Sequence, residues 1–456
     1  MRTSPARSTL HSPRKQSRSP RFTSFLSLPH VRLPVQLGYR ALAQIARGAA
    51  LVTPDSNSKV LRSLRARRGI RARYRRWGTT HRDAGRPLLW MHAPSVGEGL
   101  QARPVLELAR SRRPDAQIAY THFSPSAAAF ARSLDVDFTD YLPFDTPGDA
   151  RAALDALQPT ALVFSKLDVW PMITREARAR DVHLGLISAT LARGSSRRSL
   201  GASALLHDAY AALDVVGAID EADADRLVQL GVRPQTIVVT GDTRYDQVWA
   251  RAQAVDRAAP LLTRLRGSRP TIVAGSTWPS DEAVLLPAFE ALRRAGVDFR
   301  IVVAAHEPTP QHVGELAAWA TGASLRADRL DDATSDSDVV IVDRVGVLGD
   351  LYALADVAFV GGGFHAAGLH SVLEPAAFGA PVVFGPRFQN SRDAALLAQR
   401  HGGAPVADAA EAERRLRFWV TDATARREAG DFARALVRSG VGAAERSFSL
   451  VDRLLR

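Results

Sequence analysis

Residues 360–390 read VGGGFHAAGLHSVLEPAAFGAPVVFGPRFQN, and this stretch decides the fold class. An apolar run ends in the three glycines Gly361–Gly363, and a Leu-Glu-Pro sequence then opens a helix-like segment. In a parallel α/β sheet, a turn of this kind presents backbone N–H groups to an anionic ligand. A second short strand, residues 381–385, ends at the same edge. We therefore expect a site here, although three glycines alone fit a tight turn without a ligand equally well.

Apolar, strand-like runs alternate with helical stretches in two successive parts of the chain. The first part begins with the run from Pro87 and continues with 117–122, 161–165, 182–188, 215–219 and 236–241. The second part contains 271–276, 299–306, 338–343, 357–363 and 381–385. Such alternation predicts an α/β protein with two Rossmann-like, doubly wound parallel-sheet domains. A length of 456 residues is sufficient for two domains with full cores.

The same pattern divides the chain into six segments. We expect a disordered basic tail over 1–32, a membrane-associating helix with a polybasic flank over 33–80, a first domain over 81–245, a linker helix over 246–268, a second domain over 269–440 and a last helix over 441–456. The last helix can return to pack on the first domain.

Charge is concentrated at the front of the chain. Residues 1–80 hold 18 Lys and Arg against one acid, Asp55, and so carry +17, whereas the remainder sums to −4. Because the body is nearly neutral, we expect no nucleic-acid partner. The chain has no Cys, which excludes disulfides, thiolate metal sites and a Cys nucleophile, and which fits a cytoplasmic protein.

The segment Leu33–Val52 has apolar residues at helical spacing. It is short for a membrane span and is interrupted by Arg40 and Arg47. Basic residues follow from Lys59 to Arg76, which favours an interfacial helix on an anionic membrane surface. An ordinary amphipathic helix docked on the body is the alternative.

Candidate site residues lie where strands end. Glu98 follows the apolar run from Pro87 and precedes a helix, so it is either a general base or a carboxylate that faces the helix dipole. His306 and His370 follow later strands, and each is either a phosphate partner or a satisfied core histidine. Walker A, GxSxG and HExxH motifs are absent from the sequence.

Taken together, six motifs resemble those of the lipid A Kdo transferases, which move 3-deoxy-D-manno-octulosonic acid (Kdo) from CMP-Kdo to a lipid A precursor. They are APSVGEG (93–99), YLPFDTP (141–147), DVWP (168–171), TGDTRYD (240–246), AGST (274–277) and the segment 361–390. The resemblance implies a GT-B glycosyltransferase, with two domains facing across a cleft. It also implies a place at the cytoplasmic face of the inner membrane, peripheral or held by a single N-terminal anchor.

The resemblance assigns roles to individual residues. Glu98 falls on the catalytic base of an inverting transfer, and no metal or other cofactor is expected beside the CMP-Kdo donor. The first domain then binds the acceptor, through Ser95, Gly97, Lys166 and Arg193. The second domain binds the nucleotide sugar, through Ser276, Thr277, His306, Gly361, Gly362, Gly363, His370, Glu374 and Asn390.

The chain also departs from the family pattern. It has Lys166-Leu167-Asp168 where the family has Glu-Thr-Glu, and Ala304-Ala305-His306 where the family has Pro-Arg-His. A lost Arg removes a bidentate partner for an anion. Two alternatives therefore stay open: a related transferase with a different activated sugar acid or acceptor, and a catalytically silent homologue that binds a lipid or a sugar nucleotide.

Overall fold

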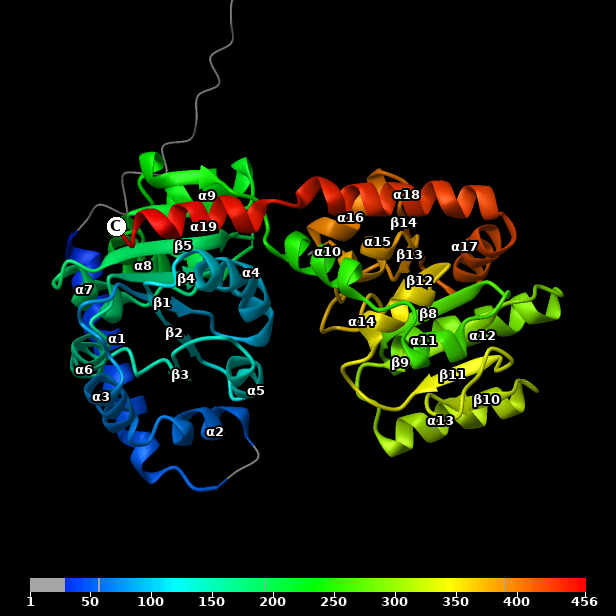
Figure 1. Ribbon diagram of the computed structural model, residues 1–456, viewed down its shortest axis with the longest axis horizontal. Helices are drawn as coiled ribbons and strands as arrows, with labels where there is room; N and C mark the ends of the chain where they lie inside the picture. The colour runs from blue at the N-terminus through cyan, green and yellow to red at the C-terminus, as the bar shows by residue number, and fades with distance from the viewer. Residues whose placement is uncertain (1–28, 56–57, 193, 390) are drawn as a thin grey trace, which may run out of the picture.

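The structure is a computed structural model that describes residues 29–55, 58–192, 194–389 and 391–456. Its first sheet has seven parallel strands in the order β3-β2-β1-β4-β5-β6-β7 (Figure 1). The strands are β1 (Leu88–His92), β2 (Gln117–His122), β3 (Phe138–Tyr141), β4 (Ala161–Ser165), β5 (His183–Ala189), β6 (Val215–Ala218) and β7 (Ile237–Val239).

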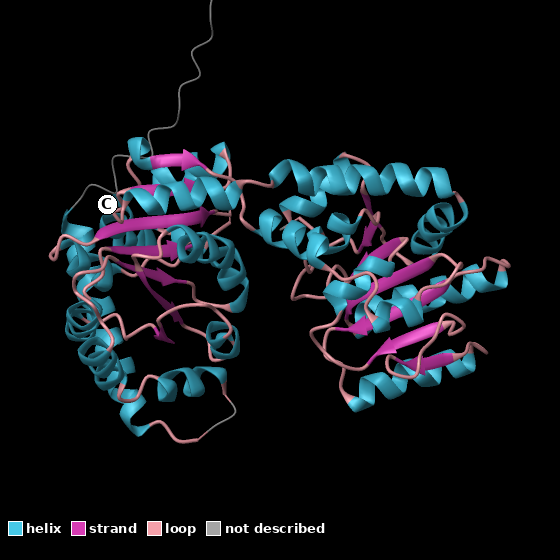
Figure 2. Cartoon of the chain, in the orientation of Figure 1, coloured by secondary structure: helices cyan, strands magenta, loops and turns pink. Residues whose placement is uncertain are grey.

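Helices cover both faces of this sheet, because a parallel sheet is stable only when both faces are buried (Figure 2). Along β1, Trp90 packs with Tyr74 of one core, while Met91 packs with Val451 and Leu454 of the other. The helices of this unit are α1 (Pro29–Val52), α2 (Lys59–Ala66), α3 (Ile70–Thr80), α4 (Val96–Arg112), α5 (Ala127–Arg132), α6 (Pro147–Leu157), α7 (Pro171–Arg178), α8 (Leu200–Ala211), α9 (Glu221–Leu230) and the last helix, α19 (Ala443–Arg453).

The second sheet also has seven parallel strands, in the order β10-β11-β9-β8-β12-β13-β14. The strands are β8 (Thr271–Thr277), β9 (Arg300–Ala305), β10 (Ala327–Arg329), β11 (Val339–Val342), β12 (Val357–Val360), β13 (Val382–Phe384) and β14 (Gly403–Pro405). Its helices are α12 (Pro279–Arg294), α13 (Pro310–Gly322), α14 (Leu348–Leu351), α15 (Leu373–Phe378), α16 (Arg392–Gln399), α17 (Ala409–Thr421) and α18 (Ala423–Gly440).

The predicted fold class is confirmed, since both halves are parallel α/β units. Three strands that the apolar pattern did not reveal are β3, β10 and β14, which have only 4, 3 and 3 residues. All three form sheet edges, where one side of the strand has no neighbour and a long apolar run is not needed. The pattern therefore identified the central strands and the outer strand β7, and missed the other three outer strands.

Two predicted boundaries need correction. The single helix expected over 246–268 is two helices, α10 (Arg244–Ala254) and α11 (Pro260–Leu265), and α11 begins at Pro260, which has no N–H to continue an earlier helix. The tail expected over 1–32 is too long, because residues 29–32 belong to α1. The rest of that expectation, residues 1–28, lies outside the described residues.

The N-terminal helix α1 docks on the first unit by one side. Tyr39 donates a hydrogen bond to Asp145 (2.7 Å), and Arg47 pairs with Asp149 (2.9 Å). On the other side, Leu37 and Ile45 are 53 % and 65 % exposed. In the part of the chain that the structure describes, we find no helix with the length and apolar character needed to cross a bilayer. The helix thus combines a docked side with an uncovered apolar side.

The chain passes between the two units once before α10 and again between α18 and α19 (Figure 1). Tyr245 on α10 donates to Asp393 of the second unit (2.9 Å). The adjacent Asp246 accepts from the amides of Gly442 and Ala444 at 2.7 and 3.0 Å, which ties the two passages together. After the second passage, α19 lies along the first sheet and supplies Val451 to its core.

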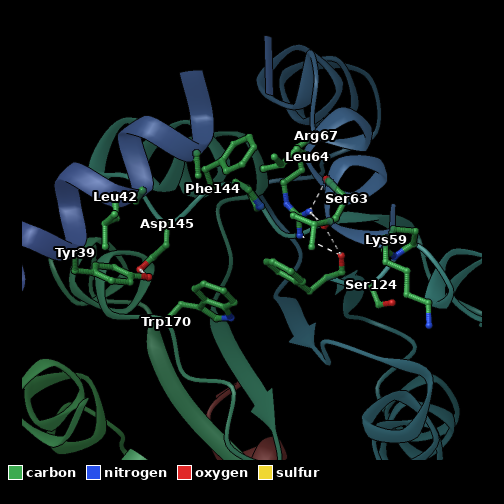
Figure 3. A pocket seen from close by; sticks show the side chains of 16 residues that line it. Tyr39, Leu42, Lys59, Ser63, Leu64, Arg67, Ser124, Phe144, Asp145 and Trp170 are labelled. Atoms are coloured by element: carbon green, nitrogen blue, oxygen red, sulfur yellow. Dashed lines mark hydrogen bonds between the residues drawn. The ribbon is translucent and has the colours of Figure 1, made fainter. Parts of the chain in front are cut away.

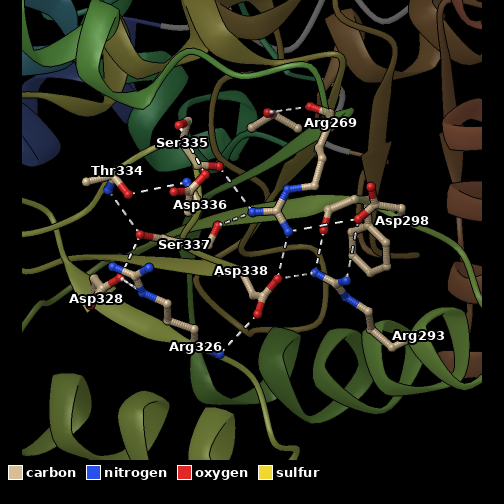
Figure 4. A network of polar contacts seen from close by, with 12 residues as sticks. Arg269, Arg293, Asp298, Arg326, Asp328, Thr334, Ser335, Asp336, Ser337 and Asp338 are labelled. Atoms are coloured by element: carbon tan, nitrogen blue, oxygen red, sulfur yellow. Dashed lines mark hydrogen bonds and ion pairs between the residues drawn. The ribbon is translucent and has the colours of Figure 1, made fainter.

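A network of ion pairs holds the amino ends of the second sheet's strands. Asp338, just before β11, accepts from Arg269 (2.7 Å) and Arg293 (2.8 Å), as Figure 4 shows. Arg269 precedes β8, so the network joins segments that lead into two strands. Ligands of doubly wound sheets bind at the opposite, carboxyl edge, and we therefore interpret this network as structural.

Candidate functional site

Glu98 lies in the first turn of α4, directly after β1. Its carboxylate accepts hydrogen bonds from the Ser95 hydroxyl and from the Lys166 ammonium, whose Nζ is 3.1 Å from Oε1. Lys166 follows β4, the strand beside β1. Burial raises the pKa of Glu98, but the Ser95 hydroxyl and the Lys166 ammonium outweigh it, so that the pKa lies below its ordinary value. The group is therefore ionised at neutral pH.

Gly97 leaves open space beside this carboxylate. A Cβ placed on Gly97 would approach only the Ser95 hydroxyl oxygen, at 3.8 Å, which is ordinary contact. A Cβ on Gly99, one turn into the same helix, would instead lie 2.4 Å from the Phe130 ring. Packing within the protein thus explains Gly99 but not Gly97, and the space at Gly97 is available to a substrate.

A second carboxylate, Asp168, lies close by in the same loop as Lys166. It accepts from the Trp170 indole (3.0 Å), pairs with Arg197 (3.2 Å) and lies 3.4 Å from the buried His92 ring. Burial raises the pKa of Asp168, whereas His92, Arg197 and Trp170 lower it, and the net pKa is below its usual value. The first unit therefore presents two ionised carboxylates, each beside a cation.

In the second unit, the buried carboxylate of Asp281 holds the glycine-rich turn. It accepts from the backbone amides of Trp278 (2.9 Å), Gly362 (2.7 Å) and Phe364 (3.1 Å). The amide of Gly361 donates to the carbonyl of Gly275 (2.9 Å). These contacts correct the expectation that the N–H groups of Gly361 and Gly362 face an anionic ligand, because protein acceptors already use them.

The three glycines are required by the protein's own backbone. A Cβ on Gly361 would lie 2.1 Å from the Ser276 carbonyl oxygen, and one on Gly363 would lie 2.5 Å from the Gly385 nitrogen. Gly362 has φ +92°, and a Cβ there would lie 2.2 Å from the Gly368 carbonyl oxygen. Substitution at these positions would therefore disturb the turn itself.

The end of β8 carries Ser276 and Thr277. The Thr277 hydroxyl is fully buried and donates to Glu282 (2.7 Å), whose other oxygen is 2.8 Å from Nε2 of His312. Ser276 is half-buried and has the left-handed φ of 54°. Of the two residues, only Ser276 keeps a side chain that a ligand can reach.

Three histidines gather around Trp278. Its indole stacks against His306 and His365, with ring centroids 4.4 and 4.0 Å apart, and its N–H donates to Nε2 of His370 (3.3 Å). Burial lowers the pKa of His370, and the neighbouring His306 lowers it further. The structure thus brings His306 and His370 together, with ring centroids 4.6 Å apart.

Glu374 lies in the first turn of α15. Burial raises the pKa of its carboxyl, and Arg251 opposes this only in part. Within the described residues, no hydrogen-bond donor reaches the carboxylate. The two remaining candidates, Arg193 and Asn390, lie outside the described residues.

Sequence analysis did not identify Arg197, Trp278 or Asp281 as parts of these sites. Asp281 has a recognisable signal, because the run Trp-Pro-Ser-Asp after a strand places Pro and Asp at the first and third positions of a helix. Arg197 has no comparable signal, since it lies in a 3-10 helix of only three residues, Ser196–Arg198, between β5 and α8.

Comparison with known proteins identifies the family. A family model described as 3-deoxy-D-manno-octulosonic-acid transferase (kdotransferase) matches residues 66–247. The 3-deoxy-D-manno-octulosonic acid transferase of Bordetella pertussis is 31 % identical over 394 residues, which cover 83 % of this chain and 90 % of the relative. The chain belongs to this transferase family. The Haemophilus influenzae member is 24 % identical over 368 residues, covering 80 % and 86 % of the two chains.

Solved structures with a similar fold agree with the predicted GT-B class. UDP-GlcNAc 2-epimerase from Neisseria meningitidis superposes with a TM-score of 0.58 at 13 % identity, covering 81 % of this chain and 99 % of that chain. A glycosyltransferase from Rickettsia africae gives 0.53 at 10 % identity, covering 81 % and 98 %. At such low identity the likeness concerns the fold alone. Membership of the Kdo transferase family confirms the enzyme class expected from the sequence, a glycosyltransferase.

The ammonium of Lys166 is expected to set the protonation of Glu98. Replacing it in Lys166→Met removes a cation that favours the carboxylate, so the pKa of Glu98 should rise and the acidic limb of the pH–rate profile should move to higher pH. Arg197→Met is the matched control, because Arg197 pairs with Asp168 and not with Glu98. An unmoved acidic limb in Lys166→Met would contradict this account.

Proposed function

We propose that the protein transfers Kdo from CMP-Kdo to a lipid A precursor in lipopolysaccharide biosynthesis, with inversion and with Glu98 as the general base. The observation that carries the proposal is the ionised Glu98 carboxylate at the end of β1, beside the open space at Gly97. Family membership supplies the sugar and the transferase chemistry. The alternative of a silent homologue has less support, because this carboxylate is both present and held in place.

In the proposed reaction, the acceptor hydroxyl attacks the anomeric carbon of Kdo. The bond from that carbon to the CMP phosphate breaks, CMP leaves with the bonding electrons, and Glu98 takes the hydroxyl proton. A carboxylate that accepts two hydrogen bonds is well oriented for this role: Lys166 donates to Oε1 and Ser95 donates to Oε2. Each oxygen keeps a second lone pair for the acceptor hydroxyl, and we expect this hydroxyl to approach on the side of Gly97, where the protein leaves room.

The second unit is the proposed donor-binding half. The half-buried carboxylate of Glu374 lacks a hydrogen-bond donor among the described residues, and the ribose hydroxyls of CMP would supply one. In the first turn of α15, the amides of Leu373 and Glu374 have no partner within the helix and suit a phosphate, whereas Pro375 has no N–H and the Ala376 amide donates to the Val372 carbonyl. Ser276 and His306 line the same strand ends, although His306 lacks the Arg that precedes it in the family.

Glu98→Gln should lower the transfer rate by about 100- to 10,000-fold, because an amide cannot take the acceptor proton. CMP affinity, measured by calorimetry, should stay within a few-fold of wild type. Glu107→Gln on the exposed side of the same helix is the control and should transfer normally. If Glu98→Gln kept more than half of the wild-type rate, another residue would have to be the base.

Glu374→Ala should weaken CMP binding by roughly 10- to 150-fold, the value of a lost charge-assisted hydrogen bond. The melting temperature should not fall, since the carboxylate makes no hydrogen bond within the described protein. Glu411 is the matched control, because it lies in the first turn of α17 and accepts from the Ala407 amide (2.6 Å). Glu411→Ala should lower the melting temperature and leave CMP affinity unchanged; the same outcome for Glu374→Ala would refute its nucleotide role.

We also propose that α1 lies on an anionic membrane surface through its uncovered side. The double variant Leu37→Glu, Ile45→Glu should sediment with anionic vesicles at least about 10-fold less than wild type, because it places charges where apolar side chains would enter the interface. Two exposed apolar residues of the second unit, Val345 and Phe432, provide the control when both are changed to Glu. Equal losses in the two double variants would argue against a specific role for α1.

A further inference from the structure

A cavity of about 490 Å³ lies between α1, α2 and the loops that follow the strands of the first sheet (Figure 3). Its volume falls within the range of small-molecule sites. Most of its wall is aliphatic or aromatic, and the residues that define its shape are Leu42, Ala46, Val60, Leu64, Phe144 and Trp170.

Of the three charged residues in the wall, Arg67 and Asp145 are buried and are satisfied by the protein, whereas Lys59 is exposed. Arg67 donates to the carbonyls of Leu142 (2.9 Å) and Ser63 (2.8 Å), and its guanidinium lies 4.1 Å from the centre of the Phe123 ring. Asp145 accepts from Tyr39 and from the amides after Trp170, at 2.7 to 3.0 Å. Because the two buried charges need no further partner and most of the wall is apolar, the occupant that fits the buried part of the cavity is apolar.

The cavity wall is hydrogen-bonded to the loop between β1 and α4, the helix that carries Glu98. The amides of Phe123 and Ser124 donate to the Pro94 carbonyl at 3.0 and 2.8 Å, and Pro94 lies four residues before Glu98. On the other side, Trp170 stacks on Phe123 with ring centroids 5.4 Å apart and donates to Asp168. The cavity wall is thus hydrogen-bonded to the segments that lead to Glu98 and Asp168.

Exposed apolar side chains flank the cavity on the helices that form it. Leu42 of α1 is 67 % exposed and Val60 of α2 is 68 % exposed, although both line the cavity. They adjoin the uncovered side of α1, where Leu37 and Ile45 also face outward. An apolar ligand arriving from a lipid surface would cover these side chains as it entered, which favours a lipid over a free small molecule.

We propose that this cavity takes one acyl chain of the lipid acceptor, so that the acceptor's sugar is held at Glu98 while its remaining chains stay in the membrane. The inference rests on the proposed function for the identity of the acceptor. It assigns acceptor recognition to apolar burial between α1 and α2, in addition to any contact with the acceptor's polar groups. Burial of each methylene group of an acyl chain favours binding. A side chain that fills the cavity should therefore lower the affinity for the acylated acceptor.

The test fills the cavity with a larger side chain. Ala46→Trp places an indole inside, whereas Ala41→Trp makes the same change at an exposed position of α1 that does not line the cavity. Transfer is measured in detergent micelles with the lipid A precursor and with the same precursor stripped of its acyl chains. For Ala46→Trp, we expect KM for the acylated acceptor to rise about 10-fold or more, with KM for the stripped acceptor and for CMP-Kdo unchanged.

A second pair of variants tests the same cavity in case Ala46→Trp does not fold. Leu42→Glu puts a charge at the cavity, and Leu51→Glu puts one at a similarly exposed position of α1 outside it, with 67 % and 69 % exposure in the parent. Binding of a fluorescent long-chain fatty acid, displaced by the acylated precursor, is measured for both. We expect Leu42→Glu to lose displaceable binding and Leu51→Glu to retain it.

The outcomes separate this proposal from the proposed function. If wild type transfers Kdo but Ala46→Trp affects both acceptors alike, or affects vesicle binding alone, the acyl-chain site is wrong and the activity stands. If wild type transfers to neither acceptor, the proposed function fails, and the fatty-acid displacement still decides on the cavity. Equal fatty-acid binding by wild type, Leu42→Glu and Ala46→Trp would overturn the acyl-chain site.

Discussion

The reversal of strand order beside β1, and again beside β8, is the constraint on which both candidate sites depend. In each sheet, connections on the two sides of this strand run in opposite directions and leave its carboxyl end uncovered. In the first sheet, the uncovered ends of β1 and β4 bring Glu98 and Lys166 together, although 68 positions separate them in the chain. In the second, the ends of β8 and β12 bring Ser276 and Gly361 into contact.

The carboxylates near the strand ends of the two units differ in the partners that they have. In the first, Glu98 and Asp168 each lie beside a cation, and their pKa values fall despite burial. In the second, Asp281 is satisfied by neutral backbone amides alone, while Glu374 has no hydrogen-bond partner among the described residues and its pKa is raised. The sites of the first unit thus pair carboxylates with cations, whereas the second unit has one carboxyl group without a hydrogen-bond donor among the described residues.

The sequence was informative at positions where a single physical requirement determines which residue types can occur. Strands buried on both faces, such as β1 and β9, have to be continuous apolar runs, and these were predicted; the edge strands β3 and β10 face no such requirement. The glycines were predicted as a turn, either facing an anionic ligand or simply tight, and the structure shows that the close approach of the protein's own backbone requires them. A glycine that makes room for a phosphate and a glycine that makes room for the Ser276 carbonyl look identical in a sequence, because both positions simply lack a Cβ.

Hydrogen-bond partners that lie far apart in the chain could not be predicted from the sequence. Asp281 reaches Gly362 across 81 positions, and neither residue has a local pattern that points to the other. The contact between Lys166 and Glu98 is similar, since each residue was recognised as a candidate on its own. In both cases the sheet order, which the sequence does not specify strand by strand, decides which loops meet.

The return of the last helix to the first unit has a mechanical consequence. If a single linker joined the two units, one unit could rotate freely relative to the other about the axis of that linker. Here the chain passes between them a second time, and Asp246 pins the second passage to the first through Gly442 and Ala444. A double tether of this kind suppresses twisting and leaves a hinge as the easiest relative movement, so the carboxyl edges of the two sheets can approach or separate while keeping the same sides turned toward each other.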